Sequence, residues 1–326
     1  MVYNKNNLKS RQNSLNIANL AQRIRENIQK VIVGKDDAIN LALVAVFCEG
    51  HVLLEDVPGI GKTTLARSLA VYLGCSFRRL QFTPDLLPYD VTGLRWFNQK
   101  TQEFEFHPGP IMSQVVLADE INRATPRTQS ALLEAMQERQ VTSDGVTRLV
   151  PRPFLVLATQ NPIELEGTFP LPEAQLDRFL LRVAIGYPSQ VEENTILERF
   201  RLADPLPDLE SVTSPEEIIT IQTERRKVRV ENSVRDYVVR LGRATRENGD
   251  IELGASPRAS MALFQAAQAW AGIQGRDFVI PDDIKTLSPS VLCHRLILSP
   301  QAQLRGRKVE ALVNDMVSQV PVPVED

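Results

Sequence analysis

The amino-acid sequence predicts an α/β fold, in which a parallel sheet covered by helices on both faces precedes a second, all-helical domain. Two observations carry this prediction. Five short apolar runs alternate with stretches long enough for crossover helices, and the chain after residue 214 shows helical periodicity almost throughout. The composition agrees, because 43% hydrophobic and 24% charged residues over 326 positions are typical of globular proteins.

The strands are expected where the apolar runs lie, at residues 51–55, 77–80, 115–119, 154–159 and 180–185. Each pair of runs is separated by enough residues for a helix that crosses back over the sheet. Strands joined in this way run parallel and are buried between two helical layers. The alternation therefore predicts an open parallel sheet with helices on both faces.

Helical periodicity divides the remainder of the chain. Near the N-terminus, apolar residues recur at helical spacing at Ile17, Leu20, Ala21, Ile24 and Ile28. We expect four parts: a tail and amphipathic helix at 1–30, the α/β core at 31–188, a linker at 189–214 and the helical domain at 215–326. Within the helical domain, Ser214, Ser256 and Pro281 mark expected helix starts.

The sequence also argues against several classes of protein. The longest unbroken apolar stretch, residues 41–48, has eight residues, whereas a membrane span needs about 20. The basic N-terminus lacks the apolar segment of a secretory signal, so a cytoplasmic location is expected. Three cysteines without CxxC spacing and three scattered histidines favour neither disulfides nor a zinc site. With 37 basic against 40 acidic residues and no polybasic segment, nucleic-acid binding is not expected.

The segment DVPGIGKT at residues 56–63 follows the first expected strand and precedes a helical stretch, which is the setting of a phosphate-binding loop. Gly59 and Gly61 would let backbone N–H groups turn toward a phosphate, and Lys62 would reach the β- and γ-oxygens. The Thr63 hydroxyl could bind Mg²⁺. The usual pattern has glycine where Asp56 stands, so we expect an altered loop geometry with nucleotide binding retained.

Two further strand ends carry polar groups suited to nucleotide hydrolysis. Asp119 and Glu120 follow the third strand, where Asp119 would hold Mg²⁺ and Glu120 would polarise the attacking water. Asn161 follows the fourth strand and would orient that water or sense the γ-phosphate. The alternatives are an acidic helix N-cap for the carboxylates and a turn residue before proline for the asparagine.

Six segments together resemble the MoxR family of AAA+ ATPases. They are EDVPGIGKT (55–63), LADEINRA (117–124), QSALLEAMQE (129–138), ATQNP (158–162), LPEAQLDRF (171–179) and GASPR (254–258). They occur in the family's order over most of residues 31–260. The resemblance implies an AAA+ phosphate-loop core with a five-stranded sheet of order 5-1-4-3-2, a C-terminal helical lid, and a ring, usually of six copies, that hydrolyses ATP with Mg²⁺.

The resemblance also implies roles that need a neighbouring subunit. Arg178 matches the arginine finger, which reaches the neighbour's γ-phosphate; the alternative is a local ion pair with Asp177 or Glu173. Arg258 matches the second sensor of the lid, in the first turn of a helix that starts at Ser256, and we expect it to point back toward the nucleotide cleft.

Weaker matches extend the expected site. Val33 and Gly34 would contact the base, and the loop residues Pro58, Ile60 and Thr64 would contact the nucleotide. Residues 104–111 resemble the family's helix-2 insertion, and residues 141–149 read as a hairpin. Both would face a pore or a client protein, with a plain surface hairpin as the alternative.

The resemblance implies a chaperone-like ATPase that remodels, matures or assembles client complexes, with a von Willebrand factor A domain partner acting in trans. The alternatives are a magnesium-chelatase-like motor subunit, a nucleic-acid translocase and a nucleotide-gated scaffold without turnover. The basic cluster RRKVR at residues 225–229 is expected on a solvated helix face or at an intersubunit contact.

Overall fold

The computed structural model describes residues 16–143, 145–161, 167–201 and 209–323. Its central sheet contains β1 (Val52–Glu55), β2 (Phe77–Gln81), β5 (Val115–Asp119), β8 (Leu155–Gln160) and β9 (Leu181–Val183). The strands are all parallel and lie in the order β2-β5-β8-β1-β9. Counted among themselves and read from β9, they follow the predicted order 5-1-4-3-2, and the predicted fold class is confirmed.

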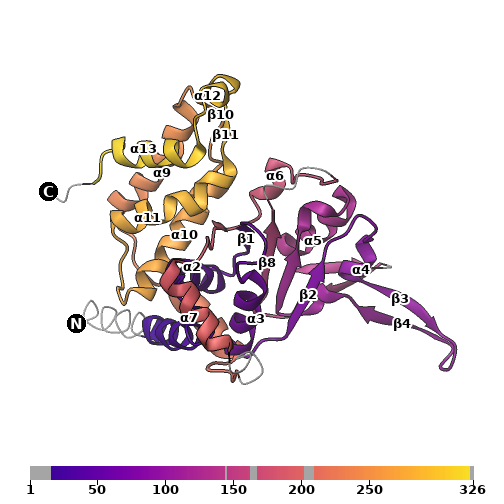
Figure 1. The fold of residues 1–326 in the computed structure, drawn as a ribbon. Coiled ribbons are helices and arrows are strands. Elements are labelled where there is room, and N and C mark those ends of the chain that lie inside the picture. Colours follow the sequence, from indigo (N-terminus) through magenta and orange to yellow (C-terminus); the bar gives the residue numbers. More distant parts are fainter. Residues whose placement is uncertain (1–15, 144, 162–166, 202–208, 324–326) are drawn as a thin grey trace, which may run out of the picture.

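Two antiparallel hairpins occur between the core strands along the sequence and account for the gaps in the numbering of those strands. The first joins β3 (Gly93–Asn98) to β4 (Glu103–Pro108) and projects from the body of the molecule (Figure 1). The second joins β6 (Gln140–Ser143) to β7 (Val146–Leu149), where the sequence predicts a hairpin. Residue 144 of its turn lies outside the described residues. Short elements complete this part of the chain: α4 (Pro88–Thr92), η1 (Pro110–Met112), η2 (Ile121–Arg123) and α6 (Glu173–Leu176).

The side chains of the sheet alternate between two apolar layers, as the period-2 geometry of strands requires. Val52, Leu54 and Leu117 face the layer of α2 (Asp36–Phe47) and α3 (Lys62–Tyr72). Leu53 and Val116 face the opposite layer, which includes α5 (Pro126–Glu138). Because both faces are covered, the inner strands β1, β5 and β8 are nearly continuous in their apolar character, whereas the edge strand β2 carries the exposed polar residues Arg78, Arg79 and Gln81.

The C-terminal part is a helical lid. Its helices are α8 (Pro215–Arg225), α9 (Asn232–Glu247), α10 (Pro257–Ile273), α11 (Pro281–Leu292), α12 (Pro300–Leu304) and α13 (Val309–Gln319). The three predicted helix starts are confirmed: the hydroxyls of Ser214 and Ser256 accept hydrogen bonds from the first turns of α8 and α10, and α11 begins at Pro281. The short antiparallel pair β10 (Ile251–Leu253) and β11 (Ile297–Leu298) was not predicted.

The lid and the N-terminal helix share one apolar cluster with the α2 layer of the core. The N-terminal helix covers residues 16–28, and the five apolar residues that predicted it are buried. The expected linker contains a helix, α7 (Gln190–Phe200), whose Arg199 donates to the carbonyls of Gln29 and Lys30 just after the N-terminal helix (Figure 1). Among the described residues, no helix is long and apolar enough to cross a membrane.

Two histidines are built into the interior as neutral groups. The Nδ1 atom of His51 accepts a hydrogen bond from Val156 N–H at 3.0 Å, while Nε2 lies 3.1 Å from the Met136 carbonyl. Protonation of Nδ1 would break the first bond, and burial lowers the pKa of both His51 and His294 well below 6.5. The unfolded chain therefore binds more protons below pH 6.5, so stability falls as the pH drops below that value.

Candidate nucleotide site

The phosphate loop connects β1 to α3, as the sequence predicts. Gly59 and Gly61 have φ angles of 83° and 91°, a conformation that side-chain-bearing residues rarely adopt. Gly61 is the N-cap of α3, so the unpaired N–H groups of the first turn point toward the loop. Lys62 donates from Nζ to the Asp56 carbonyl at 2.7 Å, and burial lowers the pKa of its ammonium group.

A cavity of about 390 Å³ at this loop brings most of the predicted site together. The predicted residues that line it are Pro58, Gly59, Gly61, Lys62, Thr63, Thr64, Asp119, Glu120 and Asn161. They come from the ends of three neighbouring strands, because the carboxyl ends of parallel strands meet at one edge of the sheet. The structure therefore groups the loop, both carboxylates and the asparagine at one place.

The two carboxylates are held in defined positions by backbone geometry and by Thr159 of β8. Glu120 has a φ of 56°, so the chain turns directly after β5 and both adjacent side chains reach the cavity. The Thr159 hydroxyl donates to Asp119 Oδ1 at 2.6 Å and accepts from the Glu120 N–H at 2.8 Å. Thr159 was not among the predicted site residues.

Strand β2 supplies two site residues that sequence reasoning missed. Arg79 donates to Asp119 Oδ2 from Nε and Nη2 at 3.0 and 2.7 Å. Gln81 donates to Glu120 Oε2 at 2.7 Å, and Arg123 forms an ion pair with the same oxygen at 3.2 Å. The available signal was the period-2 placement of two polar residues on the strand that neighbours the acidic one.

Asp56 bonds to the chain on both sides of the loop. Its Oδ1 atom accepts from the adjacent Val57 N–H at 2.8 Å, and Oδ2 accepts from Gly186 N–H at 2.6 Å. Gly186 follows β9, so this bond connects the phosphate loop to the segment that leads into α7. Asp56, which stands where the usual pattern has glycine, thus holds the phosphate loop in place through these two hydrogen bonds.

A second cavity, of about 200 Å³, adjoins the loop and has an apolar lining. Val33, Ile60 and Thr64 line it, with Ile196 and Phe200 of α7. Val33 is thus placed where a base would lie.

Gly34 is not among the lining residues of this cavity. Gly34 has a φ of 66°, a backbone conformation that favours glycine, and a Cβ atom there would displace the carboxylate end of the Glu192 side chain on α7.

Arg178 and Arg258 lie elsewhere. Both line a cavity of about 220 Å³ at the edge of the sheet where the strands begin, together with His51, which precedes β1. The side chain of neither arginine forms a hydrogen bond or ion pair with another described residue. The expectation that Arg258 points toward the nucleotide cleft of its own chain is therefore wrong, because the lid packs at the other end of β1.

The local ion pair considered for Arg178 does not form. Asp177 instead pairs with Arg295 of the lid, whose Nε lies 2.7 Å from Oδ1. Its Oδ2 accepts from the Ser256 hydroxyl at 3.3 Å, at the start of the helix that carries Arg258. Asp177 thus connects Arg178, the next residue in the chain, to the start of the helix that carries Arg258.

Comparison with known proteins agrees with this geometry. Residues 51–181 match the model of the ATPase family associated with various cellular activities (AAA), and residues 243–316 match that of the AAA lid domain. The YeaC protein of Bacillus subtilis is 53% identical over 92% of this chain and 94% of its own length. Chaperone MoxR1 of Mycobacterium tuberculosis is 43% identical over 91% of this chain and 80% of its own.

The fold is also found in a crystal structure of a Cytophaga hutchinsonii protein, with 38% sequence identity and a TM-score of 0.91. The similarity covers 98% of this chain and 99% of that one. Sequence similarity over nearly the whole length, the AAA sheet order and the phosphate loop are thus consistent with one another. The chain belongs to the MoxR family of AAA+ ATPases.

Proposed function

We propose that this protein hydrolyses Mg²⁺-ATP at sites shared between the protomers of a ring, of six copies as is usual in the family, and uses the cycle to remodel or assemble client proteins. One observation supports the shared site above the others. The phosphate-loop cavity and the two arginines without ion-pair partners lie at opposite edges of the same sheet. A single protomer cannot bring them together, whereas a head-to-tail ring does so at every interface.

Within one protomer, the residues present fit Mg²⁺-ATP. The positive φ angles of Gly59 and Gly61 leave the loop backbone open toward the cavity, with no atom within 4 Å of either added Cβ position. Lys62 would neutralise the β- and γ-phosphates. The Thr63 hydroxyl and the Asp119 carboxylate supply the oxygen ligands that Mg²⁺ prefers, and the metal would neutralise developing charge on the phosphates.

The remaining residues would act on the attacking water and the transferred group. Glu120 would accept the proton of the water, and Asn161 would orient it. Arg178 and Arg258 of the neighbouring protomer would stabilise the negative charge that develops on the γ-phosphate. An arginine finger of this kind is worth about 10³ to 10⁵ in rate.

The trans arrangement is tested by mixing two inactive variants. Lys62→Ala removes phosphate binding, and Arg178→Ala removes the finger, so each alone should lose nearly all ATP turnover. In a 1:1 mixture, about a quarter of the interfaces combine an intact phosphate loop with an intact finger, and about a quarter of the wild-type rate should return. A mixture that stays inactive, or an Arg178→Ala protein with wild-type turnover, contradicts the proposal.

A control separates hydrolysis from nucleotide binding. Glu120→Gln should retain ATP binding and lose turnover, because the amide cannot accept the proton of the attacking water. If it hydrolyses ATP at the wild-type rate, the assignment of Glu120 is wrong.

The β3–β4 hairpin is the surface that we propose binds client proteins. Trp96, Phe97 and Phe104 are 47%, 48% and 61% exposed on this projecting element. Exposed aromatic side chains of this kind mark interaction sites. By analogy with the relative named as a chaperone, the partner would be a protein, with a separate von Willebrand factor A domain subunit as the family precedent.

A further inference from the structure

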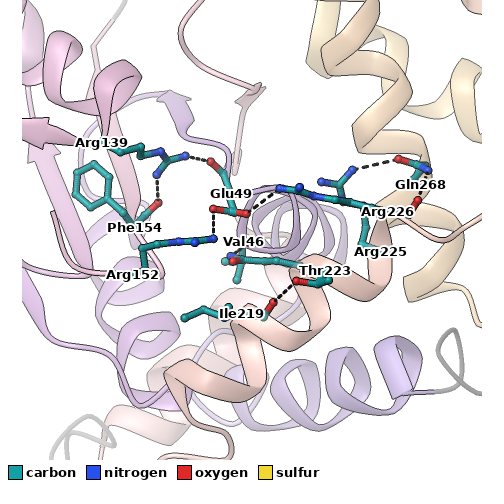
Figure 2. A network of polar contacts seen from close by, with 11 residues as sticks. Val46, Glu49, Arg139, Arg152, Phe154, Ile219, Thr223, Arg225, Arg226 and Gln268 are labelled. Atoms are coloured by element: carbon teal, nitrogen blue, oxygen red, sulfur yellow. Dashed lines mark hydrogen bonds and ion pairs between the residues drawn. The ribbon is translucent and has the colours of Figure 1, made fainter. Parts of the chain in front are cut away.

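A groove of about 870 Å³ lies between the C-terminal end of α2 and the lid helices α8, α9 and α10. Its lining contains four arginines, Arg139, Arg225, Arg226 and Arg235, and one carboxylate, Glu49. That carboxylate already accepts from Arg152 at 2.7 Å and from Arg226 at 3.3 Å (Figure 2). The groove therefore holds excess positive charge.

Arg225 is the least satisfied of these groups. It is 4% exposed, and its Nη1 donates to the neutral Gln268 side chain at 3.1 Å, as Figure 2 shows. Its Nε has no hydrogen-bond partner, and no carboxylate of the described residues lies within ion-pair distance. A buried cation without a counter-charge is costly, so an anion from outside the protomer would stabilise it. This burial also shows that the prediction of a solvated face for residues 225–229 is wrong at Arg225.

The groove is apolar as well as basic. Val239 of α9 and Met261 of α10 line it and are 48% and 61% exposed, and Phe264 lies beside them. Arg225 and Arg235 pair with no carboxylate of the described residues, although Arg235 donates to the Asn232 side chain at 2.9 Å. Exposed apolar side chains beside such arginines fit a surface with both acidic and apolar groups, because each kind of side chain then gains a partner.

Helix α7 has this complementary character. Its described residues include none that are buried, and Val191 and Leu197 are 76% and 67% exposed. It carries three acidic side chains, Glu192, Glu193 and Glu198, against the single basic residue Arg199. The helix is nevertheless held in place, because Arg199 donates to the carbonyls of Gln29 and Lys30 at 2.7 and 3.0 Å.

The groove and α7 lie at opposite ends of α2 within one protomer. Lys35, which precedes α2, lines the cavity that Ile196 of α7 also lines, whereas Cys48 and Glu49, which follow α2, line the groove. The 12 residues of α2 separate these ends by about 18 Å. A protomer therefore presents the two surfaces at different places, separated along α2, as a head-to-tail interface between two different surfaces requires.

We propose that α7 of each protomer docks in the basic groove of its neighbour, where its glutamates meet Arg225 and Arg235 and its apolar side chains cover Val239 and Met261. This inference rests on the proposed ring, because the interface that brings Arg178 to the neighbour's phosphate loop also brings these two surfaces together on the α2 side of the sheet. Nucleotide contact and lid position are then coupled, since α7 lines the base cavity at the same time.

Site-specific cross-linking tests this contact. Leu197→Cys and Met261→Cys, each in the full chain with Glu120→Gln, are mixed with ATP and treated with a short bis-maleimide. A covalent dimer should form in the mixture and in neither variant alone. A matched pair replaces Met261→Cys with Leu304→Cys, at an 89% exposed position on α12 that does not line the groove, and should give at least tenfold less dimer. Burial raises the pKa of the native Cys48 thiol to about 11, so at pH 7.5 the introduced thiols react first.

A second readout identifies what covers the groove. Monofunctional maleimide should label Met261→Cys about tenfold more slowly in rings than in single chains, and Leu197→Cys should be shielded to a similar degree. Shielding of Met261→Cys without the cross-link means that another occupant fills the groove and overturns the inference. Equal labelling in both states overturns it as well. Sedimentation of the same samples reports the ring itself, so rings without the cross-link refute α7 docking alone, and single chains with ATP refute both the docking and the proposed function.

Discussion

The ion pair between Asp177 and Arg295 gives a sharp test of how the lid is attached to the core. Arg295 is a charged residue with a side chain only 3% exposed, and among the residues that the structure describes Asp177 is the one carboxylate paired with it. Replacing Asp177 by asparagine keeps the shape of the side chain and removes its charge. The guanidinium then remains buried without a counter-charge.

The expected loss of stability follows from the contacts that remain. Removing one partner of a buried ion pair typically costs about 3–5 kcal/mol. Arg295 keeps hydrogen bonds to the carbonyls of Phe179, Leu180 and Val291, and Asp177 is 22% exposed, so the cost here should be smaller. We expect Asp177→Asn to lower the free energy of unfolding by about 2–3 kcal/mol, with a fall in Tm of roughly 3–4 °C.

Urea unfolding followed by circular dichroism, without nucleotide, measures this change. The control is Asp315→Asn, because Asp315 pairs with Arg307 at 3.5 Å while both side chains are about half exposed. That pair should contribute less than about 0.5 kcal/mol. ATP turnover should also fall in Asp177→Asn, since Asp177 positions Arg178 and the helix of Arg258. If both asparagine variants unfold at the same urea concentration, the burial argument is wrong.

Three further outcomes are expected. From pH 7.5 to 5.5, the two buried histidines should lower the free energy of unfolding by roughly 2–3 kcal/mol, and His51→Gln should remove about half of this fall in urea titrations. Asp56→Gly should leave Gly186 N–H without its partner and cost roughly 1–3 kcal/mol, with weaker ATP binding by calorimetry, while Asp56→Asn should be milder. Trp96→Ser should reduce capture of client proteins on Glu120→Gln rings and leave basal ATP turnover within about twofold, because an exposed side chain remote from the phosphate loop is lost.

The sequence predicts the sheet and the phosphate-loop cavity well because both depend on local signals. Five apolar runs identify the strands, and the rule that parallel strands place their carboxyl ends at one edge brings Lys62, Asp119 and Asn161 together. The Ser and Pro residues at helix starts likewise determine their own hydrogen bonds, so three lid helices begin where expected. In each case, the residues on which the prediction is based are the same residues that form the strand, the cavity or the helix cap.

The residues that were predicted incorrectly, or not predicted, are positioned by contacts between segments that are distant in the sequence. Arg258 was expected to point toward the nucleotide cleft because it matches the family's second sensor, but the packing of α10 against α2 decides its position. Arg225 appears solvated in a basic run and is buried because α8 and α10 meet around it. Gln81 has no motif of its own, and its role depends on the pairing of β2 with β5.

The placement of Arg258 changes how the site is understood. A cation in the first turn of a helix is unfavourable by the helix dipole, and this one shares its cavity with Arg139, Arg178 and the buried Arg295, so four positive charges gather with two carboxylates, Glu49 and Asp177. In an isolated protomer, the electrostatic repulsion between these arginines is unfavourable and serves no purpose. A γ-phosphate bound to a neighbouring protomer would reduce the repulsion between these arginines. The electrostatic energy would therefore favour association of protomers when nucleotide is bound. On this reasoning, ATP should strengthen protomer association, and Arg258→Ala should weaken that dependence while leaving nucleotide-free association unchanged.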